Sequence, residues 1–186
     1  MEHLRRNRWL QRLPRPHGSD PYYHWLVHVG SLTARLRQCC DEFRVVVLRQ
    51  RLELPSEDEQ PGLSLRRGEV AWVREVLLLC GGRPVVFAHS VLPRRCVRGG
   101  WHLLAGLGAR PLGAILFSDP RIRRLPFAFQ KLDSRDPLYH RAEAAARDFG
   151  GAVPSELWAR RSLFCRGGRP ILVTEAFLPD ILLLNP

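Results

Sequence analysis

The chain has 186 residues, a length that suits one domain and is short for two. Hydrophobic residues make up 45% and charged residues 25%, values that are typical of a globular protein and exclude a disordered one. No apolar run approaches the ~18–20 residues of a membrane span, and no secretory signal sequence is recognisable. The five cysteines are odd in number and lack C-x-x-C spacing, which predicts free thiols in a reducing cytoplasm.

The net charge of +11 raises the question of nucleic-acid binding. Of the 29 basic residues only Lys131 is a lysine, and the arginines are scattered over the whole length. A nucleic-acid interface would need a clustered patch and a recognisable motif, and we find no helix-turn-helix, zinc-knuckle or RNP signature. We therefore expect no nucleic-acid partner, although a positive molecule attracts small anions over a long range.

The first elements along the chain are helical. Residues 1–21 are rich in arginine and predict a flexible basic leader, and residues 22–186 form a single domain. Apolar residues recur at helical spacing over 22–29 and again over 32–40. Ser31, between the two, is a good N-cap for the second helix.

Residues 43–54 alternate between apolar and charged side chains, which predicts a half-buried strand. The apolar face of this strand would carry Val46, Leu48, Leu52 and Leu54. Residues 55–68 that follow are typical of a polar loop.

Residues 72–93 and 158–179 repeat one pattern at a constant offset. Each copy begins with W-x-R, runs through apolar residues to G-G-R-P, and ends at L-P. Gly-Gly supplies the positive φ angles of a tight turn, so each copy predicts a β-hairpin. The matching motifs indicate an internal repeat, with two related halves of one sheet.

Three more elements lie between and beside the hairpins. Residues 111–117 predict a helix with Pro111 at its first position. Residues 121–132 predict a strand, and Pro126 places it at a sheet edge or bulge because proline cannot donate to a ladder. Residues 139–149 are alanine-rich and helical. Six mainly antiparallel strands, with helices on one face, make an α+β fold.

Two charged residues lie inside the apolar strands, Arg74 in the first hairpin and Glu175 in the second. An arginine on an apolar face needs a carboxylate partner, from the protein or from a ligand. A carboxyl group in such a place could donate or accept a proton. The alternatives are an outward-facing arginine or an Arg74–Glu175 ion pair without a function.

Two helix starts could also bind an anion, because the first main-chain N–H groups of a helix lack partners. These are the starts at Leu32 and Leu112, which would make a carboxylate site if both pointed into one cavity. The alternative is that both bind only water. His24 and His28 have the spacing of metal ligands, but no third ligand is evident and we predict no metal site. Hydrolase, zincin and nucleotide-binding motifs are absent.

Four segments, in this order and spacing, resemble the chorismate lyase family. They are S-L-T-A-R-L at 31–36, W-V-R-E-V-L-L-L-C-G-G-R-P at 72–84, P-L-G-A-I-L-F at 111–117, and L-W-A-R-R-S-L-F-C-R-G-G-R-P-I-L-V-T-E-A-F-L-P at 157–179. The resemblance spans residues 22–180, and W-x-R-E and L-x-T-E-x-F-L-P are its most specific parts.

The resemblance implies a six-stranded antiparallel sheet with helices over a buried ligand cavity, without metal or organic cofactor. It implies that chorismate loses its enolpyruvyl group as pyruvate, leaving 4-hydroxybenzoate for ubiquinone biosynthesis. By the same resemblance Arg74 binds the ring carboxylate, and Glu175 is the acid at the para oxygen. The amides of Leu32 and Leu112 help hold the carboxylate, and leucine at 32 replaces a frequent methionine. We expect a cytoplasmic monomer whose partners are chorismate and 4-hydroxybenzoate.

The same fold also resembles the effector-binding domain of a family of bacterial transcription regulators, which bind small ligands and catalyse nothing. Those regulators carry an N-terminal winged-helix domain of ~60–70 residues. Only the leader precedes the fold here, so the regulator interpretation is weaker. A non-catalytic module that binds a small aromatic acid is the alternative function.

Overall fold

The computed structural model describes residues 8–13, 20–97, 101, 104 and 106–184. Within them, one sheet has seven strands: β1 (Phe43–Glu53), β2 (Ala71–Cys80), β3 (Arg83–Pro93), β4 (Ile122–Arg124), β5 (Ala128–Asp133), β6 (Glu156–Arg166) and β7 (Arg169–Phe177). The helices are α1 (Tyr23–Leu26), α2 (Leu32–Cys39), η1 (Pro61–Leu63), α3 (Arg94–Val97), α5 (Leu112–Ser118), α6 (Pro137–Arg147) and η2 (Pro179–Leu183).

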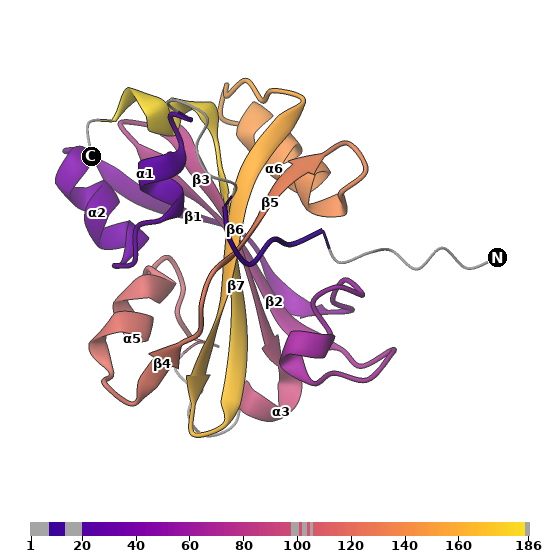
Figure 1. The fold of residues 1–186 in the computed structure, drawn as a ribbon. Coiled ribbons are helices and arrows are strands. Elements are labelled where there is room, and N and C mark those ends of the chain that lie inside the picture. The colour runs from indigo at the N-terminus through magenta and orange to yellow at the C-terminus, as the bar shows by residue number, and fades with distance from the viewer. Residues whose placement is uncertain (1–7, 14–19, 98–100, 102–103, 105, 185–186) are drawn as a thin grey trace.

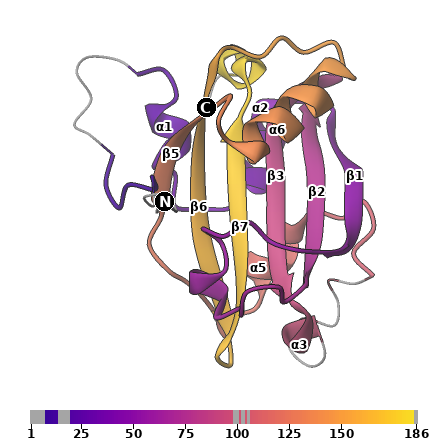
Figure 2. The same ribbon diagram turned by 90° about the vertical axis from the view of Figure 1, so that its right-hand side faces the viewer.

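The strands follow the order β1-β2-β3-β7-β6-β4, and β5 also pairs with β6. Figure 2 shows the sheet from β1 at one edge, through β2, β3, β7 and β6, to β5. Both predicted hairpins are present, as β2–β3 and β6–β7, and all pairs are antiparallel. Their turns, at 81–82 and 167–168, hold both glycines at positive φ, as the Gly-Gly motif predicts. Because β3 pairs with β7, the two hairpins lie side by side in the middle of the sheet.

The prediction of six strands is wrong, because residues 121–132 form two strands. Pro126 lies in the break between β4 and β5, and both strands pair with β6. Within the break, the Leu125 amide donates to the carbonyl of Leu163 at 2.8 Å. The Ser162 hydroxyl donates to the carbonyl of Leu125, also at 2.8 Å. Both strands lie at the edge of the sheet, as the proline predicts.

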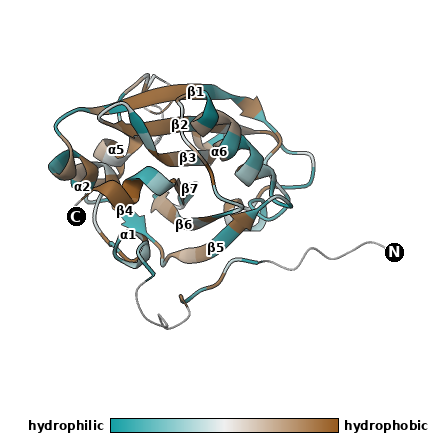
Figure 3. Ribbon diagram, turned by 90° about the horizontal axis from the view of Figure 1, so that it is seen from above, coloured by the Kyte–Doolittle hydropathy of each residue, from teal (hydrophilic) through white to brown (hydrophobic). Residues whose placement is uncertain are grey.

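The prediction that helices cover only one face of the sheet is also wrong. Helices α1, α2 and α5 lie on one side of the sheet and α6 lies on the other (Figure 1). Leu26 and Leu36 belong to a core cluster with Val86 of the sheet, on the first side. Ala142 of α6 belongs to another cluster, with Phe87 on the second side. Hydrophobic residues concentrate in the strands between these layers (Figure 3).

The predicted apolar face of β1 is wrong beyond Val47. The pairing with β2 shifts between Val47 and Arg49, which is a β-bulge and reverses the alternation of side chains. Leu48 and Leu52 are therefore 36% and 41% exposed. Arg49 turns inward instead and lies 2.6 Å from Glu75.

The prediction of free thiols is wrong for two cysteines. Cys40, just after α2, and Cys80, at the end of β2, form a disulfide that ties this helix to the sheet. Cys39, Cys96 and Cys165 are free. The cytoplasmic location is inferred from free thiols, and since two of them are paired it stays a prediction. Among the helices described, none is long and apolar enough to cross a membrane.

Residues 8–13 of the predicted leader lie against the domain. Trp9 is 8% exposed, and its indole N–H donates to Asp58 at 3.0 Å. The main chain of Leu10 pairs with Phe129 of β5 through two hydrogen bonds. The other leader positions, 1–7 and 14–19, lie outside the described residues.

A buried ionic cluster lies on the α6 side of the sheet. His89 on β3 is 2% exposed and lies between two carboxylates, 3.0 Å from Glu59 and 2.9 Å from Glu75. Glu75 also contacts Arg49 and Arg141, at 2.6 and 2.8 Å. Burial alone would lower the pKa of His89, but hydrogen bonds and charge from the two glutamates outweigh it and raise the pKa to about 9.

We expect the protein to lose stability as the pH rises from about 6.5 to about 9, because His89 then loses the proton that pairs it with Glu59 and Glu75. The stabilisation is complete below pH 6.5, the ordinary pKa of histidine, and amounts to about 3 kcal/mol for a shift of this size. Urea unfolding at several pH values measures it. His89→Gln is expected to remove the slope and the exposed-site control His24→Gln to keep it. An equal slope in wild type and His89→Gln would contradict this assignment.

Candidate active site

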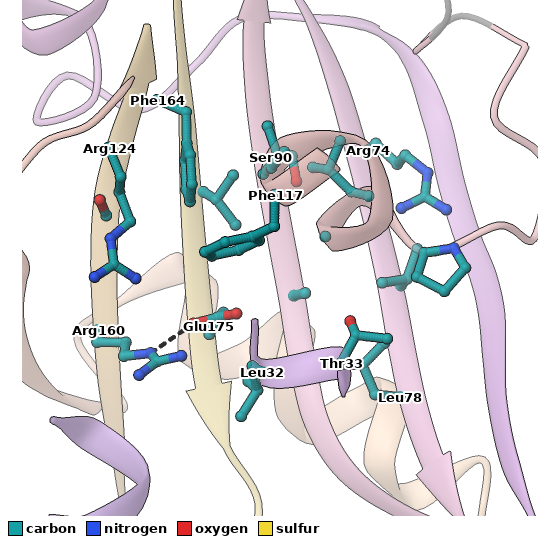
Figure 4. A pocket seen from close by; sticks show the side chains of 18 of the residues that line it. Leu32, Thr33, Arg74, Leu78, Ser90, Phe117, Arg124, Arg160, Phe164 and Glu175 are labelled. Atoms are coloured by element: carbon teal, nitrogen blue, oxygen red, sulfur yellow. Dashed lines mark hydrogen bonds and ion pairs between the residues drawn. The ribbon is translucent and has the colours of Figure 1, made fainter. Parts of the chain in front are cut away.

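A pocket lies on the face opposite α6, between the sheet and the first residues of α2 and α5 (Figure 4). Strands β2, β3, β6 and β7 supply its floor, and apolar side chains make up most of the wall. Its polar side chains are those of Thr33, Arg74, Ser90, Arg124, Arg160, Ser162 and Glu175.

All four residues predicted for the site line this one pocket: Leu32, Arg74, Leu112 and Glu175. They come from four separate elements, so the fold brings them together. Arg74 on β2 and Glu175 on β7 lie on the same face of the sheet, the face that α2 and α5 cover. The two leucines are the first residues of α2 and α5.

The starts of α2 and α5 lie close together over the pocket. Ser31 caps α2, and its hydroxyl accepts a hydrogen bond from the Ala34 amide at 3.2 Å. The prediction that Pro111 is the first residue of α5 is wrong, because Pro111 is the N-cap and the helix begins at Leu112. A methyl group at Gly113 would lie 3.2 Å from the Ser31 hydroxyl oxygen, so glycine allows the close approach of the two helices.

Arg74 is a buried cation without a carboxylate partner among the described residues. It is 5% exposed, and one of its terminal nitrogens donates to the carbonyls of Gly108 and Arg110 at 2.9 and 3.3 Å. Its buried Nε has no hydrogen-bond partner in the described part of the chain. Burial lowers the pKa of Arg74 to about 10, so the side chain stays charged at neutral pH. Its charge is therefore available to an anionic ligand.

Glu175 pairs with Arg160, so the Arg74–Glu175 ion pair that the sequence left open as an alternative is wrong. The Nε atom of Arg160 donates to the Glu175 carboxylate at 2.6 Å. Arg160 is 1% exposed and its Nη1 atom also donates to the carbonyls of Trp25, Leu26 and His28, at 2.8–3.1 Å. One side chain thus holds the carboxylate and the end of α1 in place.

Sequence reasoning missed Arg160 as a site residue, although a signal was present. The repeat aligns the arginine of W-x-R in the first hairpin, Arg74, with Arg160 in the second. Arg160 is also the direct cross-strand neighbour of Glu175 in the hairpin. Because Arg74 was predicted to face the apolar side, its counterpart could have been predicted to do the same.

Arg124 is a third guanidinium in the pocket, and sequence reasoning missed it too. It lies at the end of β4, next to the break at Pro126, where no alternation predicts its direction. Its Cζ atom lies 4.1 Å from the ring centroid of Phe127 and 6.0 Å from that of Phe117. Burial, and then the charge of Arg160, lower the pKa of Arg124. No ion pair of Arg124 is found within the described residues.

Among the described residues, the charged ones that line the pocket are therefore three arginines and one glutamate. Glu175 neutralises Arg160, which leaves two cations, Arg74 and Arg124, on opposite sides of the pocket (Figure 4). The pocket suits a compact dianion with an apolar ring. No group of three potential metal ligands is present in the part of the chain that the structure describes.

Comparison with known proteins decides the family. Residues 4–183 match the model of the chorismate lyase family. The chain is 58% identical to a protein of Aromatoleum aromaticum named "Probable chorismate pyruvate-lyase", over 94% of this chain and 93% of that protein. The chain belongs to the chorismate lyase family. A protein of an Azoarcus strain with the same name is 51% identical, over 94% of this chain and 92% of that one.

The fold of this chorismate lyase family member also occurs among regulators. The effector domain of PhnF from Mycobacterium smegmatis matches with a TM-score of 0.58 at 14% identity, over 83% of this chain and 91% of that one. The ligand-binding domain of a putative GntR-family regulator from Bordetella bronchiseptica matches with a TM-score of 0.52 at 21% identity, over 75% and 86%. At these identities the likeness shows a shared fold, as the sequence comparison with regulators predicts.

Proposed function

We propose that this protein binds chorismate in the pocket and eliminates pyruvate from it, leaving 4-hydroxybenzoate. Membership of the chorismate lyase family supports this carbon–oxygen lyase activity. The observation that carries the assignment is Arg74, a buried guanidinium without a carboxylate among the described residues, in the same pocket as the carboxyl group of Glu175. A ring acid with a para oxygen fits between two such groups.

Arg74 binds the ring carboxylate in this proposal. A guanidinium can donate two parallel hydrogen bonds to a carboxylate, and burial strengthens them. Leu32 and Leu112, at the starts of α2 and α5, help with their main-chain N–H groups. Side-chain size at these two positions then shapes the pocket without changing the N–H contacts.

Glu175 orients the C4 hydroxyl group at the other end of the ring. Arg160 fixes the carboxylate for this task through the 2.6 Å hydrogen bond, and the three carbonyls around Arg160 fix the arginine. A hydrogen-bond acceptor that is already held in position needs little rearrangement when the substrate binds. Such fixed orientation of the reacting groups lowers the barrier of the reaction. Among the described residues that line the pocket, Glu175 has the one carboxyl group that could accept a proton from the ring.

The reaction balances without an external reagent. The C4–H bond gives up its proton, its electrons form a ring double bond, and the C3–O bond breaks. The ring becomes aromatic, and the enolpyruvate that leaves takes up a proton at its methylene carbon to give pyruvate. Aromatisation drives the reaction, so the protein needs mainly to orient the ring and stabilise charge on the leaving group.

Incubating the purified protein with chorismate tests this function against that of a binding module. We expect pyruvate and 4-hydroxybenzoate to appear in equal amounts over many turnovers, measured by a coupled lactate dehydrogenase assay and by ultraviolet absorbance. A parallel sample without protein corrects for spontaneous breakdown of chorismate. Tight binding of 4-hydroxybenzoate without release of pyruvate would instead support the non-catalytic module.

A further inference from the structure

We propose that Arg124 binds the carboxylate of the enolpyruvyl group, so that it recognises the substrate and not the aromatic product. This assignment rests on the proposed function and adds a specificity-determining residue to it. Glu175, the one carboxylate among the described lining residues, pairs with Arg160. Arg124 is therefore, with Arg74, one of two arginines of the pocket that have no ion pair among the described residues.

The position of Arg124 fits this role. Its side chain lies on the Glu175 side of the pocket, across from Arg74 (Figure 4). Phe127 holds the guanidinium over its ring at 4.1 Å, and Arg160 stacks on the same ring at 4.5 Å. Such stacking fixes the plane of a guanidinium while leaving its N–H edge free to bind a carboxylate.

The shape of chorismate assigns each cation to one carboxylate. The enolpyruvyl ether is on C3, next to the C4 hydroxyl and far from the ring carboxylate on C1. When Arg74 holds the ring carboxylate and Glu175 the C4 hydroxyl, the enolpyruvyl carboxylate lies on the Glu175 side of the ring. Among the described residues of the pocket, Arg124 is the cation on that side without a carboxylate of its own.

The same contact would stabilise the departing group. As the C3–O bond breaks, its electron pair moves onto the ether oxygen of enolpyruvate, next to the carboxylate already present. A fixed cation beside this group favours the charged leaving group over the bound ether. The product 4-hydroxybenzoate has one carboxylate and makes no contact that requires Arg124.

This difference between substrate and product gives a sharp test with Arg124→Gln. We expect kcat/KM for chorismate to fall by on the order of 10²-fold, as for the loss of a charge-assisted contact in a buried site. The Kd of 4-hydroxybenzoate, measured by calorimetry, is expected to stay within about twofold of wild type. Arg123→Gln removes an exposed arginine from the same strand and is expected to leave both quantities unchanged.

Two outcomes would overturn the assignment. A parallel loss of chorismate turnover and 4-hydroxybenzoate affinity would mean that Arg124 only supports the pocket or binds the ring carboxylate. An unchanged kcat/KM would remove Arg124 from the site.

If Arg124→Gln does not fold, Arg124→Lys replaces it, because lysine keeps the charge without the planar fork. The same comparison, between the loss of turnover and the change in product affinity, then decides. A wild-type protein that releases no pyruvate would refute the proposed function itself.

Discussion

Replacing Arg74 with methionine is expected to lower kcat/KM for chorismate by at least ~10²-fold while leaving the free energy of unfolding unchanged or higher. Methionine keeps a long side chain in the pocket and removes the charge. Because Arg74 is buried without a carboxylate partner among the described residues, the folded protein carries the desolvation cost of that charge, and only a bound anion offsets it. Methionine also removes the hydrogen bonds to the carbonyls of Gly108 and Arg110, and the relief of the desolvation cost is expected to offset that loss. Steady-state kinetics and urea unfolding measure the two effects.

The matched control for this experiment is Arg83→Met, at the turn of the same hairpin, where the arginine is exposed. It removes the same charge and should change neither activity nor stability by much. The Arg74 variant should also lose affinity for 4-hydroxybenzoate, in contrast to Arg124→Gln. Near-normal kinetics in Arg74→Met would remove this residue from the site, and a large loss of stability would show that its main role is structural.

The central strands could be predicted from the sequence because their signals are local. Gly-Gly dictates the conformation of both turns, and the apolar runs on either side fix the hairpins. The charged residues Arg74 and Glu175 stand out in such runs, since burial of an isolated charge is unfavourable. These two charged residues, one in each hairpin, are what allowed the site to be predicted on this sheet.

The errors arise where pairing across the sheet overrides the local pattern. A bulge in β1 turns Arg49 toward Glu75 and leaves Leu48 exposed. The residues of the strand contain no signal that predicts this bulge. The disulfide joins Cys40 to Cys80 across 40 positions, a contact that exists only because α2 packs on β2. The direction of Arg124 likewise depends on how β4 ends, which the neighbouring proline does not specify.

The ion pair between Arg160 and Glu175 carries the largest expected effect on stability. Replacing Arg160 with methionine leaves a carboxylate without its partner at 19% side-chain exposure, and removes the donor from three main-chain carbonyls. We expect the free energy of unfolding to fall by about 3–5 kcal/mol, the usual cost of breaking a buried pair from one side. Turnover should fall as well, because Glu175 would no longer be held in position.

Neutralising the remaining partner tests this explanation directly. In the double variant Arg160→Met, Glu175→Gln, both charges of this pair are removed together and neither is left without its partner, so the protein should regain about 1–3 kcal/mol of the lost stability without regaining activity. The carbonyls of Trp25, Leu26 and His28 still lack their donor, which is why the recovery is partial. Strictly additive losses in the two single variants and the double variant would show that the two side chains stabilise the fold independently. A recovered stability without turnover would separate the structural role of the pair from its role in holding the substrate hydroxyl.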